Sequence, residues 1–253
     1  MRMPTAILIT GASSGLGEAL ARHYAHPRRK LFLSGRDAGR LEAVSLAVQA
    51  AGAEVQACVL DVTDRDGMAA WIEECDRRHA LDLVVANAGI SAGTGQGGES
   101  DAQTRAIFAV NVDGVMNTVL PAVVLMRPRR AGQIAIVSSL ASFRGMPGAP
   151  AYCASKAAVR VWGEGLRGEL ARDNIRLSVI CPGFVTTRMT AVNSFPMPFL
   201  MDAPRAARIM AEGLARDRGR ISFPWQLAAL SWLAAALPDP VMDWVSRRLP
   251  SKP

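Results

Sequence analysis

Short apolar runs alternate along the chain with longer amphipathic segments. The apolar runs predict strands at 6–10, 30–34, 54–60, 81–87, 132–139, 175–181 and 220–223. Between them, apolar residues recur at helical spacing and predict helices near 15–26, 37–51, 64–78, 101–126, 151–172 and 203–216. Runs of Val, Ile and Leu separated by helices are typical of parallel strands buried on both faces. The pattern predicts an α/β fold: a doubly wound parallel sheet in three α/β/α layers.

The composition indicates that this sheet belongs to a single domain. The 253 residues are half apolar and one-fifth charged, and no linker, repeat or low-complexity run divides residues 1–253. The first residues enter a strand without a signal-peptide pattern, and the four cysteines show no paired or metal-ligand spacing. We therefore expect a cytoplasmic protein with reduced thiols and no metal.

The formal net charge of +7 narrows the set of partners. A basic surface suits an anionic cofactor, an anionic membrane or an acidic carrier protein. The basic residues are scattered, and no basic patch with interleaved aromatic residues accompanies them. This pattern argues against nucleic acid as a partner.

Ligands of doubly wound sheets bind beyond the carboxyl ends of the strands, and the first strand end carries a glycine-rich turn. Gly11, Gly15 and Gly17 follow this strand and open the first helix. Glycines permit a tight turn and a close approach of the backbone to a ligand. The helix N-terminus offers free N–H groups and a positive dipole end, and Ser13 and Ser14 add hydroxyl donors. The spacing G-x-x-x-G-x-G thus predicts a site for the pyrophosphate of a dinucleotide.

Further motifs follow this turn in a fixed order. They are Thr10-Gly11-Ala12-Ser13-Ser14-Gly15-Leu16-Gly17, Asp61-Val62, Asn87-Ala88-Gly89, Asn111-Val112 with Gly114, Ser139, Tyr152-x-x-x-Lys156, and Pro182-Gly183 followed by Thr187. With this set, over about residues 5–190, the chain resembles the short-chain dehydrogenases/reductases, which have a Rossmann-type fold.

The resemblance implies a nicotinamide cofactor and assigns residues to it. Asp61 and Val62 would hold the adenine, and Asn87-Ala88-Gly89 would steady the central sheet beside the cofactor. Val185 and Thr187, after the Pro182-Gly183 turn, would reach the nicotinamide carboxamide. The full set expected to bind the cofactor is Gly11, Ser13, Ser14, Gly15, Leu16, Gly17, Arg36, Asp61, Val62, Asn87, Ala88, Gly89, Tyr152, Lys156, Pro182, Gly183, Val185 and Thr187.

The end of the second strand favours NADP(H) over NAD(H). It carries Ser34 and Gly35 and no carboxylate, and Arg36 follows. An arginine accommodates a ribose 2′-phosphate, whereas an acidic residue accepts from a 2′-hydroxyl. Asp37 would repel a phosphate, but its position suits the N-cap of the next helix. NAD(H) stays open, because Arg36 can also be an ordinary surface charge.

Tyr152 and Lys156 stand four residues apart in a predicted helix, so their side chains share one face. Reduction of a ketone needs a proton donor within hydrogen-bond reach of the carbonyl oxygen. A free tyrosine has a pKa near ~10, and a neighbouring ammonium lowers the pKa of a phenol. We therefore expect Lys156 to tune Tyr152 as a general acid and base.

Two further side chains complete the predicted catalytic set of Asn111, Ser139, Tyr152 and Lys156. Ser139 ends the fifth strand, and its hydroxyl can hold the carbonyl oxygen and stabilise negative charge there. The neighbouring Ser138 points to the opposite side of the strand. The resemblance implies that Asn111 holds a water that links Lys156 to solvent.

The last third of the chain departs from the carrier-protein reductases of this family. A loop and helix at 188–216, rich in Met and Phe, are expected to cover a hydrophobic substrate. The extension at 225–253 contains an apolar run, 227–237, that is too short to span a bilayer. Its apolar residues, with Arg247 and Arg248 behind them, fit an interfacial helix or a helix covered by protein. We expect protein to cover it next to the substrate entrance; peripheral membrane contact is the less favoured alternative.

The sequence therefore predicts an NADP(H)-dependent oxidoreductase that interconverts a hydrophobic ketone or aldehyde and its alcohol. A 3-oxoacyl-thioester reductase is the first alternative, although the ending typical of that group is missing. A non-catalytic NADP-binding sensor or scaffold is the second, although such proteins usually lose the tyrosine or the lysine. We expect a homodimer or homotetramer.

Overall fold

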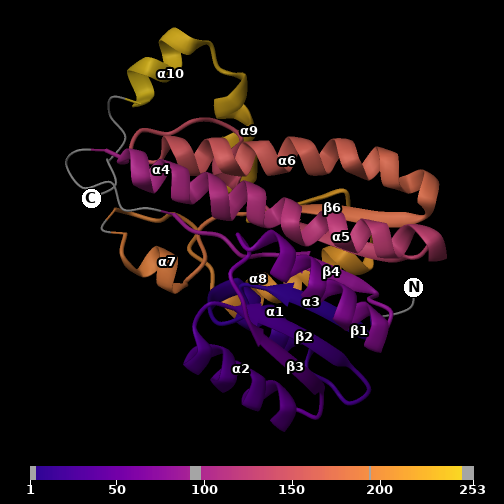
Figure 1. Ribbon diagram of the computed structural model, residues 1–253. Coiled ribbons are helices and arrows are strands. Elements are labelled where there is room, and N and C mark those ends of the chain that lie inside the picture. The colour runs from indigo at the N-terminus through magenta and orange to yellow at the C-terminus, as the bar shows by residue number, and fades with distance from the viewer. Residues whose placement is uncertain (1–3, 92–97, 194, 247–253) are drawn as a thin grey trace.

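The computed structural model describes residues 4–91, 98–193 and 195–246. Its centre is one sheet of parallel strands in the order β3-β2-β1-β4-β5-β6-β7 (Figure 1). Their bounds are β1 Ala6–Thr10, β2 Lys30–Gly35, β3 Glu54–Val59, β4 Leu83–Ala86, β5 Gly132–Val137, β6 Ile175–Pro182 and β7 Arg220–Phe223. The strand order reverses between β1 and β4, and a doubly wound sheet binds its ligand at such a point.

Helices cover both faces of the sheet. One layer holds α1 (Gly15–Tyr24), α2 (Ala38–Ala50) and α8 (Ala203–Ala215), and the other holds α3 (Arg65–Arg78), α5 (Gly114–Arg129) and α6 (Pro150–Leu170). The shorter helical elements are α4 Asp101–Phe108, η2 Ala109–Asp113, η3 Leu140–Ser142, η4 Ala171–Asp173 and α7 Arg188–Ala191. The Rossmann-type three-layer fold expected from the sequence is confirmed.

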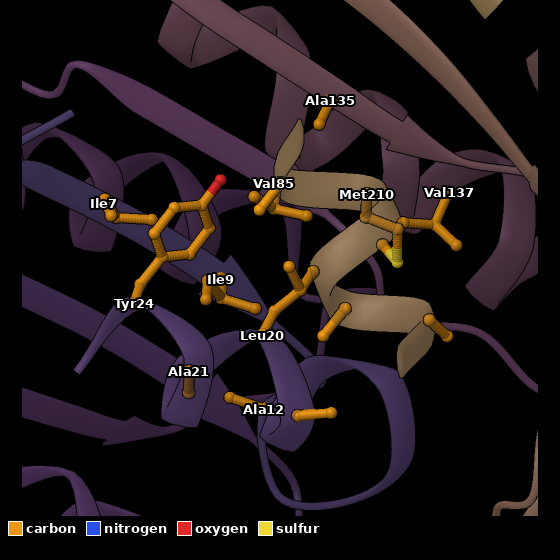
Figure 2. Packing of buried hydrophobic residues seen from close by; sticks show 14 of the residues in the cluster. Ile7, Ile9, Ala12, Leu20, Ala21, Tyr24, Val85, Ala135, Val137 and Met210 are labelled. Carbon is orange, nitrogen blue, oxygen red and sulfur yellow. The ribbon is translucent and has the colours of Figure 1, made fainter. Parts of the chain in front are cut away.

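Alternation along the strands creates two separate cores. In β1, Ile7 and Ile9 join Leu20, Tyr24 and Met210 on the face of α1 and α8 (Figure 2). The neighbouring residues on β1 point to the other face and pack against α3, α5 and α6. Successive side chains of a strand point to opposite faces, so continuous apolar runs are what a sheet buried on both sides requires.

The segment predicted as one helix at 101–126 is interrupted. α4 ends at Phe108, a π-helical turn η2 follows, and α5 begins at Gly114. By length and composition the stretch Asp101–Arg129 could cross a membrane, but half of its apolar window is buried inside the protein. π-Helical turns are rare and occur frequently at functional sites, and this one carries Asn111.

The C-terminal extension forms α9 (Trp225–Ala236) and α10 (Asp239–Ser246), which lie at one end of the molecule (Figure 1). α9 packs one side on the protein, through Leu227 and Ala228. Its other side stays open, with Trp225 75% and Trp232 65% exposed. The chain's own core thus leaves this side uncovered.

Candidate active site

One cleft opens at the carboxyl ends of the strands and brings together most of the predicted site residues. Those that line it are Gly11, Ser13, Ser14, Gly15, Leu16, Arg36, Val62, Asn87, Ala88, Gly89, Ser139, Tyr152, Lys156, Pro182, Gly183, Val185 and Thr187. Gly17, Asp61 and Asn111 do not line it. Residues that line it but were not among the predicted site residues include Gly35, Asp37, Arg40, Ile90 and Ser138. Arg188 and Met189 also line it, and they belong to the segment 188–216 that was expected to cover the substrate.

The glycine turn forms an open cradle at the end of β1. Gly11 has a φ of +65°, which an L side chain rarely adopts, and a Cβ atom there would meet the Ala88 backbone at 2.8 Å. Gly17 lies below the turn, where a Cβ atom would meet the Gly11 carbonyl oxygen at 2.3 Å. Ser14 is the N-cap of α1, yet its side chain makes no capping hydrogen bond. The first N–H groups of α1 and the Ser14 hydroxyl can therefore serve an anion.

The Asn87-Ala88-Gly89 turn ties the end of β4 to the end of β1. The Asn87 side chain donates to the Thr10 carbonyl oxygen at 2.9 Å, and the Thr10 hydroxyl accepts from the backbone N–H groups of Asn87 and Ala88 at 3.1 and 3.2 Å. These bonds join the two strands at the point where the strand order reverses. These hydrogen bonds fix the shape of the cradle, which agrees with the expectation that Asn87-Ala88-Gly89 steadies the sheet beside the cofactor.

Paired charges border the end of the cleft next to β2. Arg36 contacts Asp61 at 3.5 Å, and Arg40 contacts Asp37 at 2.8 Å. The Asp37 carboxylate also accepts from the Arg40 backbone N–H, which confirms the predicted N-cap of α2. The Arg40 Nε is buried and has no hydrogen-bond partner among the described residues. In the sequence, Arg40 could have been found by its position three residues after Asp37, the N-cap of α2.

Asp61 holds its charge beside Arg36. Burial tends to raise the pKa of this carboxyl, but hydrogen bonds from the Thr63 N–H and hydroxyl, with the Arg36 charge, outweigh burial and lower the pKa. Asp61 is therefore ionised at neutral pH and competes with any bound anion for Arg36.

Tyr152 and Lys156 lie at the opposite end of the cleft, on the first turns of α6. The Lys156 Nζ lies 6.0 Å from the Tyr152 ring centre and donates to the Val137 carbonyl oxygen at 2.9 Å. Lys156 is only 3% exposed, and its burial lowers its pKa to about 8. An amine with such a pKa exchanges protons readily near neutral pH.

The pKa of Tyr152 lies above its ordinary value. Burial of the phenol is the main cause, and a hydrogen bond with the Ser139 hydroxyl offsets part of it. Burial therefore outweighs the lowering of this pKa that was expected from the neighbouring Lys156, because a desolvated phenol resists ionisation.

Asn111 lies behind the cleft, fully buried in the π-helical turn. Its side-chain oxygen accepts from the Ile90 N–H at 2.8 Å, and its nitrogen donates to the Ile90 carbonyl oxygen at 2.9 Å. A Cβ atom at Gly89 would lie 3.1 Å from the Lys156 Nζ and 3.2 Å from the Asn111 Oδ1, so both atoms flank the bare Gly89. One lone pair of the Asn111 oxygen remains for a further donor.

Among residues 4–91, 98–193 and 195–246, no group of three or more His, Cys, Asp or Glu side chains could hold a metal ion. The described cleft brings a phenol, a hydroxyl and an amine next to an anion cradle. This arrangement suits proton transfer to or from an oxygen beside a bound dinucleotide.

The fold and this cleft together define a dinucleotide-binding oxidoreductase. The family model for short chain dehydrogenases matches residues 5–195. An uncharacterized oxidoreductase of Myxococcus xanthus is 42% identical over 243 residues, 96% of each chain. The chain belongs to the short-chain dehydrogenase family, and its predicted class, an oxidoreductase acting on CH–OH groups with NAD(P), is confirmed.

Solved structures share the whole fold. A short-chain dehydrogenase/reductase from Burkholderia phymatum, in complex with NAD, has a TM-score of 0.84 at 26% identity and covers 99% of this chain and 98% of its own. A short-chain dehydrogenase from Sphingobium yanoikuyae, in complex with NADPH, has a TM-score of 0.80 at 23% identity and covers 96% of each chain.

Proposed function

We propose that the protein interconverts a hydrophobic ketone or aldehyde and its alcohol, with NADP(H) as cofactor. The observation that carries the proposal is the position of Tyr152, Ser139 and Lys156 in the same cleft as an uncapped glycine turn. That cleft continues to Arg36 and Arg40 at its other end. One cleft therefore offers proton-transfer groups and an anion cradle at its two ends.

The residues of the cleft fit a nicotinamide dinucleotide. The turn at Gly11 and Gly17 leaves no room for side chains, and the free N–H groups of α1 suit a pyrophosphate. Relatives of the same fold bind NAD or NADPH. When bound, the nicotinamide exchanges a hydride with the substrate carbon.

The chain's own residues handle the proton and the substrate oxygen. In the reducing direction the Tyr152 hydroxyl donates its proton to that oxygen, and the Ser139 hydroxyl holds the oxygen by a hydrogen bond. Lys156, with its pKa of about 8, passes a replacement proton toward Tyr152. Asn111 holds a water beside Lys156 through its remaining lone pair and so links the lysine to solvent.

The choice of NADP(H) rests on Arg36 and Arg40. Guanidinium groups bind phosphate through paired donors, and both residues line the cleft. Asp37 caps α2, so its carboxylate is already engaged by a backbone N–H at 2.9 Å. Asp61 counts against this choice, because it must release Arg36 to a 2′-phosphate.

The substrate class rests on the segment after β6. Met189 lines the cleft, Phe184 and Phe195 stack edge to face at 6.0 Å, and Met201 pairs with Val185. Val185 and Met189 thus place apolar side chains in the lining of the cleft, and further apolar residues of the same segment pack behind them. They support a bulky apolar substrate and a covering role for 188–216.

A screen of the purified protein against ketones, aldehydes, alcohols and a 3-oxoacyl thioester, each with NADPH, NADH and their oxidised forms, tests the proposal. We expect turnover of bulky apolar ketones with NADPH preferred. Turnover restricted to the thioester would favour the carrier-type reductase. Tight NADPH binding with no turnover of any compound would favour a sensor. The same preparations, measured by light scattering, test the proposed homodimer or homotetramer.

A further inference from the structure

On α6, polar side chains at four-residue spacing continue beyond Tyr152 and Lys156. Arg160 and Glu164 lie at this same spacing, so the four side chains follow one face of the helix. The Arg160 side chain is only 16% exposed. A guanidinium buried in this way needs partners. One is Glu164 on α6, and the others lie on the segment that carries Ser139.

The first link between that segment and α6 comes just before Ser139. The Ser138 hydroxyl donates to the Lys156 carbonyl oxygen at 2.7 Å, in a buried bond. The Ser138 N–H donates to the Ile180 carbonyl oxygen at 2.7 Å, which keeps the residue on the sheet. Ser138 thus joins the end of β5 to the helix that carries Tyr152.

The second link comes just after Ser139. Arg160 donates to the Ser142 carbonyl oxygen at 3.3 Å, and its guanidinium lies 4.8 Å from the centre of the Phe143 ring. Arg220, on β7, approaches the same ring at 5.5 Å. Cation–π contacts of this kind stabilise a ring in place.

Glu164 makes this arrangement of two cations stable. Its carboxylate contacts Arg160 at 3.3 Å and Arg220 at 2.7 Å. Two guanidinium groups on one ring would repel each other without an anion near both. α6, β7 and the Phe143 segment therefore meet in one charge-balanced cluster, which we call the Phe143 clamp: Phe143, Arg160, Glu164 and Arg220.

Ser139 lies between these two links, and its own hydroxyl is constrained. It accepts from the Ala141 N–H at 3.1 Å and contacts the Pro182 carbonyl oxygen at 3.5 Å. The Ser142 N–H donates to the Ser139 carbonyl oxygen at 3.1 Å, and this hydrogen bond closes the turn. A shift of the turn η3 would therefore move the Ser139 hydroxyl relative to Tyr152.

We propose that Arg160, with Glu164 and Phe143, is a positioning residue that holds Ser139 against Tyr152. The inference rests on the proposed roles of Ser139 and Tyr152, but it concerns the geometry between them. Ser138 fixes the segment on one side of Ser139, and the Phe143 clamp fixes it on the other. The helix that carries the proton donor thereby also sets the position of the hydroxyl that holds the substrate oxygen.

The test needs no substrate, because the chain has only two tyrosines, Tyr24 and Tyr152. Protein labelled with ¹³C at the tyrosine ring carbon that bears oxygen gives one NMR signal for each. Ser139→Ala defines the signal change that follows loss of the Ser139–Tyr152 hydrogen bond, with a rise in the pKa of Tyr152. We expect Arg160→Met to move the Tyr152 signal in the same direction, and the double variant to move it no further than Ser139→Ala alone.

Matched variants separate positioning from general damage. Arg127→Met also removes an ion pair to α6, at Glu169, and should leave the Tyr152 signal unchanged. Arg160→Lys keeps the charge and should restore part of the wild-type signal. The buried Tyr24 reports folding in every variant. Should Arg160→Met lose the native Tyr24 signal, Phe143→Leu takes its place with a smaller shift in the same direction.

The proposal is overturned if Arg160→Met, or Phe143→Leu in its place, leaves the Tyr152 signal at its wild-type position in folded protein. It is also overturned if the shift is equally large in the Ser139→Ala background, because the effect would then bypass Ser139. A failure to find any reducible ketone would count against the proposed function and would leave these spectra valid.

Discussion

At the end of the cleft next to β2, the Arg36 and Asp61 side chains are 58% and 38% exposed and pair at 3.5 Å. At the end next to β5 and α6, Lys156 is 3% exposed and bonds to a backbone carbonyl. Exposed pairs contribute only about 0–1 kcal/mol to stability and are screened by salt. Burial, in contrast, shifts the pKa of Lys156 to about 8 and raises that of Tyr152.

The difference shows two uses of ionisable groups within one cleft. Weak exposed pairs can exchange an internal partner for a ligand phosphate at little cost. Buried groups have no such freedom, because water cannot replace a lost partner. Burial moves the pKa of Lys156 toward neutral pH and moves the pKa of Tyr152 away from it. The β2 end is suited to selecting an anion, and the β5 end is suited to moving a proton.

The largest effect is expected at the β5 end. Tyr152→Phe removes the proposed acid and keeps the ring, so turnover of a ketone found in the screen should fall roughly 10²–10⁴-fold or more. NADPH binding, measured by fluorescence, should persist. Tyr24→Phe, in the remote core, is the matched control. Near-normal turnover by Tyr152→Phe would remove Tyr152 from the mechanism.

The next effect concerns cofactor choice at the β2 end. Arg36→Ala should weaken NADPH binding roughly 10- to 100-fold, because hydrogen bonds to a charged group are worth about 1.5–3 kcal/mol. NADH binding should change little, since NADH has no 2′-phosphate. Arg105→Ala, which also loses an exposed ion pair, serves as control. Equal losses for both cofactors, or a wild type that prefers NADH, would contradict the NADP(H) assignment.

A smaller effect is expected in the pH dependence of stability. Below about pH 8, folded and unfolded Lys156 are both protonated, and the folded state bears the cost of burial. Between about pH 8 and the unfolded pKa near ~10.4, only the unfolded chain holds this proton, so stability rises with pH. Relative to Lys156→Met, the wild type should gain at most about 1.4 kcal/mol per pH unit there. Urea unfolding of both proteins measures this, and parallel pH profiles would be the contrary result.

The smallest expected effect is a difference in how the two ends of the cleft respond to salt. Raising the ionic strength from 0.1 to 1 M shortens the Debye length from about 10 Å to about 3 Å. NADPH affinity should fall several-fold, while the Tyr152 NMR signal should stay in place. A Tyr152 signal that moved as strongly as the affinity would show that the β5 end is more open to solvent than its burial indicates.

The local sequence pattern was sufficient to predict the strands of the sheet and most of the residues that line the cleft. The glycine turn, Asp37 as helix cap and the Tyr152–Lys156 pair were all predicted from spacing, because each depends on neighbours within one or two turns of chain. Arg160 and Glu164 carried the same four-residue signal, but their significance depends on Phe143 and Arg220, which only the fold brings to α6. Arg40 was missed because its unpartnered Nε is a consequence of packing.

Periodicity and motif order, by themselves, determined the class of fold, the family and many of the residues that line the cleft, since these depend on which residues are apolar and on fixed local geometries. Three features were decided only by the tertiary structure. The π-helical turn directs Asn111 toward Ile90, a contact between elements that hydrophobic spacing does not encode. The proton affinities of Tyr152 and Lys156 follow from burial, which overrides the simple attraction expected between neighbours. The outer side of α9 stays exposed because the helix meets the core only through its opposite side, with Leu227 and Ala228.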